Sequence, residues 1–501
     1  MRAEHATCGD PRVSNQKLRR GLRPYQLSMI SIGGVIGVGM FLGAGATVSL
    51  AGPAVILAYA LGGAVMFAVM LALGEMTVSR PVPGAFRVHA DLALGPYYAF
   101  IVGWMYYLSW LGSMSSEIVA ATTYLDRWLP RSVSPILAAS LVLVLTLVNL
   151  AKVESFGTFE FYFAGIKVVA ITLFILVGAA LLIGYPGRPG IGLVNYTGQG
   201  GFAPNGFAGL VRSMALVMVA YGGTEVIGVA AGETRDPARS VPTAVRGIAL
   251  RTLILYVGSM AVLVGIIPWF QTGLRGSPFV LVYDELGIPG ASDVMNLVVL
   301  TAALSSLNCG LYTSSRMVYS LAQGSSVVGG LAEVSPRTGV PYRAVLASTG
   351  GVYAAVLIYW LSPGTAFLYV TSVAGFGFLF VWLMIALSHI EWRSKVTAES
   401  SFKAPFYPYL SILVAILLVG FIATLWAMPE ERVGIYVGLS ALLVLSAAYG
   451  LQRLSYLPRV EKLLPRSLMS LMRPRVAAGA IASIGSALAM YFGLVSKEIE
   501  G

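Results

Sequence analysis

The chain has 501 residues, of which 57% are hydrophobic and only 11% are charged. Soluble domains carry roughly 25% charged residues, so this composition excludes an ordinary soluble protein and indicates a protein that crosses a membrane many times. The formal net charge of +11 does not indicate a nucleic-acid partner, because the basic residues concentrate in the tails and loops that we expect inside the cell.

Apolar runs follow one another from residue 26 onward, and about 20 apolar residues span a bilayer core as a helix. The segment before residue 25 is polar and basic and lacks the short apolar core of a secretory signal, so we expect a cytoplasmic N-terminal tail, residues 1–24. Few of the 33 Lys and Arg fall in the expected outer loops, which favours this topology. The twelve expected spans are residues 26–50, 53–78, 97–125, 134–151, 156–184, 207–232, 248–269, 291–320, 342–361, 364–389, 406–427 and 433–450.

A further apolar segment, VAAGAIASIGSALAMYFGLV at 476–495, has two interpretations. It is long enough to cross the membrane, and its small residues at four-residue spacing favour close helix packing. The alternative is an amphipathic helix on the inner surface. We favour a thirteenth span.

Two of the expected spans carry glycine-rich interruptions. The first is SIGGVIGVGMFLG at 31–43, with five glycines, and the second is VAYGGTEVIGVAAGE at 219–233. A single segment of this kind is also explained by helix packing. Interrupted helices at corresponding places in two halves of the chain indicate a transporter site built from inverted repeats.

The interruptions have a physical purpose in such a site. Irregular backbone is tolerated at membrane depth only where it lines a cavity or is buried in protein. An opened helix offers N–H groups to an anion and carbonyl groups to a cation, and an amino acid zwitterion has one of each. Glycine allows the close approach and the unusual dihedral angles that the arrangement needs.

Other kinds of chemistry have no support in the sequence. Two cysteines, Cys8 and Cys309, do not form a disulfide framework, and three scattered histidines do not indicate a metal site. There is no phosphate-binding loop and no nucleophile–base set. We therefore expect no cofactor, no metal, no catalytic residue and no enzyme activity.

Several stretches resemble bacterial amino acid permeases, and they occur in the order found in that family. They are GLRPYQLSMISIGGVIGVGMFLG (21–43), LGEM (73–76), PVPGAF (81–86), AYGGTEVIGVAAGETRDPARSVPTAV (220–245), LSSLNCGLYTSSRMVYSLAQGS (304–325) and ALSHIEWR (386–393). The chain is similar over about residues 20–450 to the amino acid transporter family of the amino acid–polyamine–organocation superfamily.

The resemblance implies an all-α integral membrane protein with the leucine-transporter-type fold, in which helices 1 and 6 are broken. Spans 1–5 (25–184) and spans 6–10 (207–389) would form the inverted repeats. Spans 11 and 12 (406–450) would be peripheral, and residues 451–501 would form a C-terminal extension.

The resemblance also implies how the substrate binds. The amides of Gly37, Val38 and Gly39 would meet its carboxylate, although Val38 lacks the hydroxyl that many relatives carry there. Carbonyls near Val219 and Gly222 would meet its amino group. Tyr221 matches an aromatic gate over the substrate, and its alternative role is packing. Helical spacing, rather than the resemblance, adds Ser113, Met114 and Glu117, which lie along one face of the third span and are further candidates for the pocket.

Lys167 is a charged residue at membrane depth, where such residues are functional hypotheses by default. A desolvated ammonium loses its proton more easily, so this lysine is a candidate for proton coupling. The resemblance places it where sodium-coupled members of the wider fold bind a cation. We expect contacts with the carbonyls near Ile32 and Gly33 and with the hydroxyl of Ser305 or Ser306. The alternative is a permanently charged lysine paired with a glutamate.

Glu225 follows the second interruption. It is a second candidate for proton coupling, and the alternative is that it fixes the unwound backbone. Glu75 and Glu160 lie nearer the inner ends of their spans, where we expect structural roles. In span 8, Asn308 and Tyr312 lie four residues apart, and both helix packing and substrate contact explain them.

The segment GETRDPARSVPTAV follows span 6 on the expected inner side. Its prolines restrict the backbone, and its charged residues are close enough in sequence to form an ionic network. We expect an intracellular latch formed by Glu233, Asp236, Arg239 and Arg246.

These observations predict a secondary active transporter that imports an amino acid across the bacterial cytoplasmic membrane together with protons. An amino acid exchanger of the same fold is the alternative, and a receptor that binds amino acids without transporting them is a more distant one. The expected partners are an amino acid, protons and the lipid bilayer. The sequence leaves the identity of the amino acid and the oligomeric state open.

Overall fold

The computed structural model describes residues 18–186, 188–272, 277–285, 289–323, 328–361, 365–396 and 400–455. The expected thirteenth span and most of both tails lie outside these residues. Apart from loops and turns, the described residues form helices and one two-stranded hairpin of two residues per strand.

The helices follow the expected spans closely, with short helices in several connections. Their bounds are α1 Pro24–Val35, α2 Val38–Phe41, α3 Ala44–Ala51, α4 Val55–Ser79, α5 Ala85–Ala93, α6 Pro96–Leu125, α7 Ser134–Leu150, α8 Val153–Ile183, α9 Val194–Thr197, α10 Gly206–Ala220, α11 Val226–Ala231, α12 Pro237–Ile266, α13 Pro278–Glu285, α14 Ala291–Ala322, α15 Tyr342–Leu361, α16 Thr365–Lys395, α17 Tyr409–Ala427 and α18 Arg432–Ser455. The strands are β1 Gly184–Tyr185 and β2 Arg188–Pro189.

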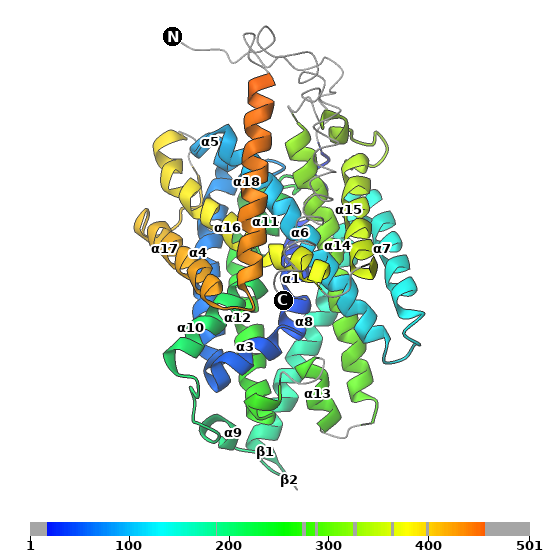
Figure 1. Cartoon of the computed structure of the whole chain (residues 1–501), viewed down its shortest axis with the longest axis vertical. Helices are drawn as coiled ribbons and strands as arrows, with labels where there is room; N and C mark the ends of the chain where they lie inside the picture. The colour runs from blue at the N-terminus through cyan, green and yellow to red at the C-terminus, as the bar shows by residue number, and fades with distance from the viewer. Residues whose placement is uncertain are drawn as a thin grey trace, which may run out of the picture.

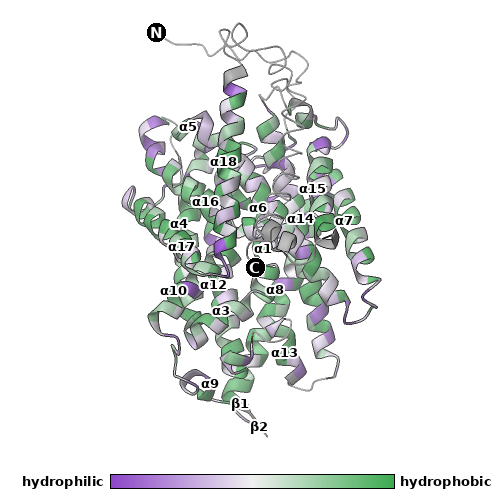
Figure 2. Ribbon diagram, in the orientation of Figure 1, coloured by the Kyte–Doolittle hydropathy of each residue, from purple (hydrophilic) through white to green (hydrophobic). Residues whose placement is uncertain are grey.

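By length and composition, seven helical stretches in the described residues can cross a membrane. They are Ala44–Ser79, Val153–Ile183, Pro237–Ile266, Ala291–Ala322, Ser372–Lys395, Tyr409–Ala427 and Arg432–Arg453. Figure 2 shows hydrophobic residues prevailing along the helices, with strongly hydrophilic residues mostly near the helix ends. Exposed leucines on α7 and α8, such as Leu147 and Leu176, would form apolar patches in water and suit a lipid-facing surface instead.

Most long helices run close to the long axis of the molecule (Figure 1). One end carries α5 and is called the α5 end below. The opposite end carries α9, α13 and the hairpin and is called the α13 end.

The helices differ in how deeply they lie. In the most apolar 18-residue stretch of each helix, 72% is buried in α14 and α16. The corresponding buried share is only 33% in α17 and α18. Helix α6 packs against both α14 and α16, and α1 packs against α8, α12 and α14. The core therefore surrounds α1 and α6, with α17 and α18 at the periphery.

The helix that the sequence predicts as the first span is interrupted. Helix α1 ends at Val35, and α2 begins at Val38 after the extended residues Ile36 and Gly37. The sixth expected span is interrupted in the same way, because α10 ends at Ala220 and α11 begins at Val226. We call these two places the first break and the second break.

Candidate functional site

The two breaks lie against each other in the core. A side chain at Gly223 would place its Cβ 2.5 Å from the carbonyl oxygen of Gly34, so the two backbones are in direct contact. Tyr256 of α12 joins them from the side. Its buried hydroxyl donates to the carbonyl of Val35 at 2.8 Å and lies 3.3 Å from that of Ala220. Carbonyls freed by the interruptions are thus partly satisfied by one side chain, as buried polar groups require.

A cavity of about 420 Å³ adjoins both breaks. This central cavity extends along α6 to Thr123, two residues before that helix ends at the α13 end. Its volume lies within the range of roughly 300–1,000 Å³ typical of small-molecule sites. It is lined by Gly34, Val35, Gly37, Val38, Gly39, Leu42, Gly43, Ser113, Ser116, Glu117, Val119, Ala120, Thr123, Val219, Ala220, Gly222, Ser306, Ala374, Gly375 and Phe378.

Most of the residues proposed from sequence to bind substrate line this cavity. They are Gly37, Val38, Gly39, Ser113, Glu117, Val219 and Gly222. The cavity thus brings together backbone from both breaks and one face of α6.

Two of the proposed substrate residues do not line it. Tyr221 is fully buried, and its hydroxyl donates to the carbonyl of Tyr59 at 2.9 Å while its ring stacks on Tyr256. This placement matches the packing alternative rather than a gate. Met114 is also fully buried and faces Gly310 of α14. Both side chains point away from the cavity because each packs against a neighbouring helix.

Glu117 occupies the first break. Its carboxylate oxygens accept the N–H of Val38 at 3.2 and 3.3 Å. A Cβ at Gly37 would meet Oε1 of Glu117 at 2.4 Å and Oγ of Ser306 at 2.7 Å, so both side chains point at the same stretch of backbone. The first break therefore already holds a carboxylate, which shows that the amide of Val38 is oriented to bind one.

Lys167 reaches the opposite side of the first break from α8. Its Nζ is fully buried and donates to the carbonyls of Gly33 at 2.8 Å and Ile36 at 2.6 Å. The sequence interpretation named Ile32 and Gly33. The carbonyl of Ile32 instead accepts the N–H of Ile36, because α1 is still helical there. Lys167 thus connects α8 to the break itself.

Neither of the two serines proposed beside Lys167 forms a hydrogen bond with it among the described contacts. Ser305 donates to the carboxylate of Glu160 at 2.7 Å, and Ser306 lines the central cavity. Glu160 also accepts Nδ2 of Asn308 at 2.6 Å and is fully buried. This places Glu160 and Asn308 in one buried hydrogen-bond network between α8 and α14.

Glu225 lies inside the second break, with no exposed surface. It accepts the N–H of Gly223 at 3.0 Å, the hydroxyl of Tyr106 at 2.9 Å and Nε1 of Trp382 at 3.0 Å. These three bonds hold the irregular backbone between α6 and α16. They match the structural alternative for this glutamate.

The ionic latch expected after span 6 takes a different form. Glu233 is buried and pairs with Arg316 of α14 at 2.8 Å, and it accepts the hydroxyl of Tyr312 at 2.9 Å. Asp236 instead accepts the backbone N–H of Arg239 at the start of α12, where both residues are exposed. Exposed Arg246 lies over the ring of Phe402. The expected four-residue network is not formed because only Glu233 faces the core.

The Glu233 cluster also fixes the segment directly before α1. The backbone N–H of Leu22 donates to the carbonyl of Glu233 at 3.0 Å, and the N–H of Arg235 donates to the carbonyl of Leu22 at 3.1 Å. Phe156 stacks on Tyr312 with ring centroids 4.3 Å apart. Between the breaks and the α5 end, the molecule is therefore closed by a buried charged cluster and by packed aromatic rings.

No metal site competes with this interpretation in the described ranges, where no group of three or more His, Cys, Asp or Glu residues is placed to hold a metal ion. The sequence model of the amino acid permease family matches residues 26–449. The chain belongs to the amino acid permease family. It is therefore a member of a family of membrane transporters rather than of enzymes.

Three relatives illustrate the range of this family. The permease is 36% identical over 449 residues to the gamma-aminobutyric acid permease of Bacillus subtilis, a match that covers 89% of this chain and 94% of the relative. It is 36% identical over 437 residues to the aromatic amino acid transport protein AroP of Escherichia coli O6:H1, covering 87% and 96%. It is 35% identical over 442 residues to the probable threonine/serine transporter YbxG of B. subtilis, again covering 87% and 96%.

Three residues of the permease site were missed by sequence reasoning. Tyr256 bridges the breaks, Phe378 lies against Gly222 in the central cavity, and Arg316 neutralises Glu233. Arg316 lies inside the eighth expected span, so the rule that charged residues within spans are functional could have identified it. Tyrosine and phenylalanine in apolar helices carry no comparable signal.

Replacing Gly223 by alanine tests whether the contact between the breaks is needed. Gly223 has φ +100°, and a Cβ would approach Gly34 to 2.5 Å. We expect a loss of about 1–3 kcal/mol of stability from backbone strain and a large loss of transport. Gly420 of α17 is a matched control, because a Cβ there meets nothing within 4 Å. Equal thermal stability and transport in both variants would contradict the close contact.

Proposed function

We propose that this permease imports an amino acid across the bacterial cytoplasmic membrane by proton symport, with its N-terminus in the cytoplasm. The observation that carries the proposal is the pairing of two broken helices around one cavity. Backbone amides of the first break and backbone of the second break face a volume suited to a small molecule. This arrangement can bind both ends of a zwitterion without a dedicated charged side chain for each.

In this mechanism the substrate carboxylate takes the position that Glu117 holds at Val38. The amides of Gly37 and Gly39 flank that position, and the amino group lies toward the carbonyls of Val219 and Gly222. Glu117 then has to turn away or share the Val38 amide with the substrate. Phe378, which lies against Gly222, covers the substrate in place of Tyr221.

Lys167 supplies the coupling. When protonated, it holds the first break to α8 through charge-assisted hydrogen bonds to Gly33 and Ile36. Loss of the proton weakens these bonds and lets the break move relative to α8. Proton release and rearrangement of the substrate site are thereby linked. Glu225 keeps the second break in its irregular form during the cycle.

The alternation between faces follows from the same architecture. We assign residues 25–184 and 207–389 to two inverted repeats, with 406–450 as the peripheral pair of spans. The described state has its cavity on the α13 side of the breaks and its closed cluster on the α5 side. Opening of the Glu233–Arg316 cluster then accompanies release of the substrate into the cytoplasm.

The substrate class stays open within amino acids. The names of the relatives mention gamma-aminobutyric acid, aromatic amino acids and threonine or serine. The central cavity has a carboxylate, Glu117, but that group is already engaged with Val38. A panel of amino acids tested for thermal stabilisation of the purified permease would identify the ligand, since a ligand that binds the folded state raises the unfolding temperature.

Uptake into proteoliposomes then tests the function. With the amino acid identified by the panel, an outside-acid pH gradient should drive accumulation inside the vesicles above the external concentration. A protonophore should abolish it. Accumulation only when vesicles are preloaded with an amino acid, independent of the pH gradient, would identify an exchanger. Binding without any flux would identify a receptor.

A further inference from the structure

A second cavity, of about 250 Å³, adjoins the central one. It lies between α3, α10, α16 and the connection from α17 to α18, and we call it the Glu431 cavity. The two cavities share five lining residues: Gly39 and Gly43 after the first break, Val219 and Ala220 before the second break, and Gly375 of α16. Its volume is below the roughly 300–1,000 Å³ of sites for drug-sized ligands, so it suits a molecule as small as a single amino acid.

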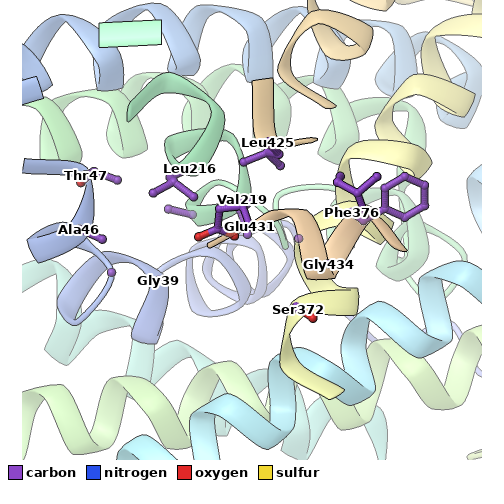
Figure 3. Close-up of a pocket in the computed structure, with 14 residues that line it drawn as sticks. Gly39, Ala46, Thr47, Leu216, Val219, Ser372, Phe376, Leu425, Glu431 and Gly434 are labelled. Atoms are coloured by element: carbon purple, nitrogen blue, oxygen red, sulfur yellow. The ribbon is translucent and has the colours of Figure 1, made fainter. Parts of the chain in front are cut away.

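Among the residues that the structure describes, Glu431 is the only charged one in the lining of this cavity. It lies directly before the start of α18, and Figure 3 shows its side chain among the residues that line the cavity. The remaining wall is apolar or small, and its larger side chains are Leu216, Phe376, Leu425 and Ile435. A carboxylate that faces an apolar chamber is complementary to an ammonium group on a small organic molecule.

The Glu431 carboxylate has no partner among the residues that the structure describes: it forms no ion pair and accepts no hydrogen bond there. The adjacent Arg432 does not neutralise it, because Nε of Arg432 donates to the carbonyl of Trp426 at 2.9 Å. Burial raises the pKa of Glu431, and the neighbouring Glu430 raises it further. A cation in the cavity would relieve both effects.

The backbone holds Glu431 in this position. Its N–H donates to the carbonyl of Met428 at 3.1 Å, and its carbonyl accepts the N–H of Gly434 at 3.0 Å. These bonds fix the turn between α17 and α18, so the carboxylate is anchored at the cavity by local structure rather than by a flexible loop.

We propose that the Glu431 cavity is a second binding site, in which the Glu431 carboxylate binds the ammonium group of an amino acid before the molecule moves to the breaks. The inference rests on the proposed function, because it takes the same substrate. Glu117 lines only the central cavity and Glu431 only the second one. Each chamber therefore has its own carboxylate, and the one in the second chamber is available for a ligand.

Equilibrium binding of the radiolabelled amino acid to purified full-length permease tests this site. The wild type should bind a second molecule in addition to the central one, and Glu431→Gln should bind only the central one. Glu430→Gln is the matched control, because Glu430 is exposed and does not line the cavity; it should bind like the wild type. Two molecules bound by Glu431→Gln, or a single molecule bound by the wild type, would overturn the proposal.

Further measurements separate this proposal from the proposed function. In proteoliposomes, Glu431→Gln should raise the KM for uptake about tenfold, the effect of losing one hydrogen bond to a charged group, with a smaller change in kcat.

The N-acetyl derivative of the amino acid, which lacks the ammonium, should not bind at the second site. Displacement of the second molecule by sodium chloride at matched ionic strength, but not by choline chloride, would overturn the proposal in favour of an inorganic cation site. If the wild type binds no amino acid at all, the result would instead contradict the proposed function.

Discussion

Lys167→Ala should abolish accumulation of the amino acid driven by an outside-acid pH gradient. The substitution removes a buried ammonium that donates to the carbonyls of Gly33 and Ile36. Hydrogen bonds to charged groups contribute about 1.5–3 kcal/mol each, so two of them can hold the first break against α8. We expect accumulation to fall to the level of empty liposomes, measured as the steady-state ratio of internal to external substrate.

One further variant and one control test whether the loss of accumulation arises because residue 167 can no longer release a proton. Lys167→Arg keeps a permanent positive charge, since arginine does not lose its proton in proteins. It should fold and bind substrate yet fail to accumulate it. Lys152→Ala alters an exposed lysine at the start of the same helix and should behave like the wild type. Accumulation by Lys167→Ala or Lys167→Arg at wild-type levels would remove Lys167 from the coupling mechanism.

Glu233→Gln should destabilise the permease by about 3–5 kcal/mol, the usual effect of removing one partner of a buried ion pair. Both Glu233 and Arg316 have side chains only 1% exposed, so the arginine would be left buried without its counter-charge. The measurement is thermal or denaturant unfolding of the purified protein. The same variant should weaken closure at the α5 end and so lower substrate accumulation.

An exposed pair provides the control for this variant. Glu333 and Arg343 are 2.6 Å apart with side chains about half exposed, and Glu333→Gln should cost no more than about 1 kcal/mol. The double variant Glu233→Met with Arg316→Leu removes both charges and should recover much of the lost stability. An equal loss in Glu233→Gln and Glu333→Gln would contradict a buried cluster.

The breaks could be predicted from sequence because their cause is local. Gly37 and Gly223 each lie in a glycine-rich stretch with apolar segments on both sides. Such a pattern indicates a helix that is interrupted at membrane depth. Lys167 could also be assigned to the first break, since a charged residue in an apolar helix needs partners. The carbonyl that it would contact besides Gly33 could not be assigned, because this depends on where α1 stops. Helix α1 continues to Val35, so the carbonyl of Ile32 is bonded within the helix and Lys167 contacts that of Ile36.

The errors concern the direction of side chains and contacts between distant segments. Tyr221 lies at a break, yet its ring packs between Tyr59 and Tyr256. Glu233 was assigned partners nearby in sequence, whereas its partner Arg316 comes from a helix 83 residues further along the chain. Glu431 lies in a short connection and carries no pattern that would indicate a cavity. Such features depend on tertiary packing, which neither helical periodicity nor local motifs encode.

A crystal or cryo-EM structure of the permease with its amino acid bound tests the central claim most directly. We predict that the ligand carboxylate lies within hydrogen-bonding distance of the amides of Gly37–Gly39, with Glu117 either displaced from Val38 or sharing its amide with the ligand. The ligand amino group should contact main-chain carbonyls of the second break near Val219 and Gly222. An amino acid bound away from both breaks, with Glu117 still on Val38, would contradict the account.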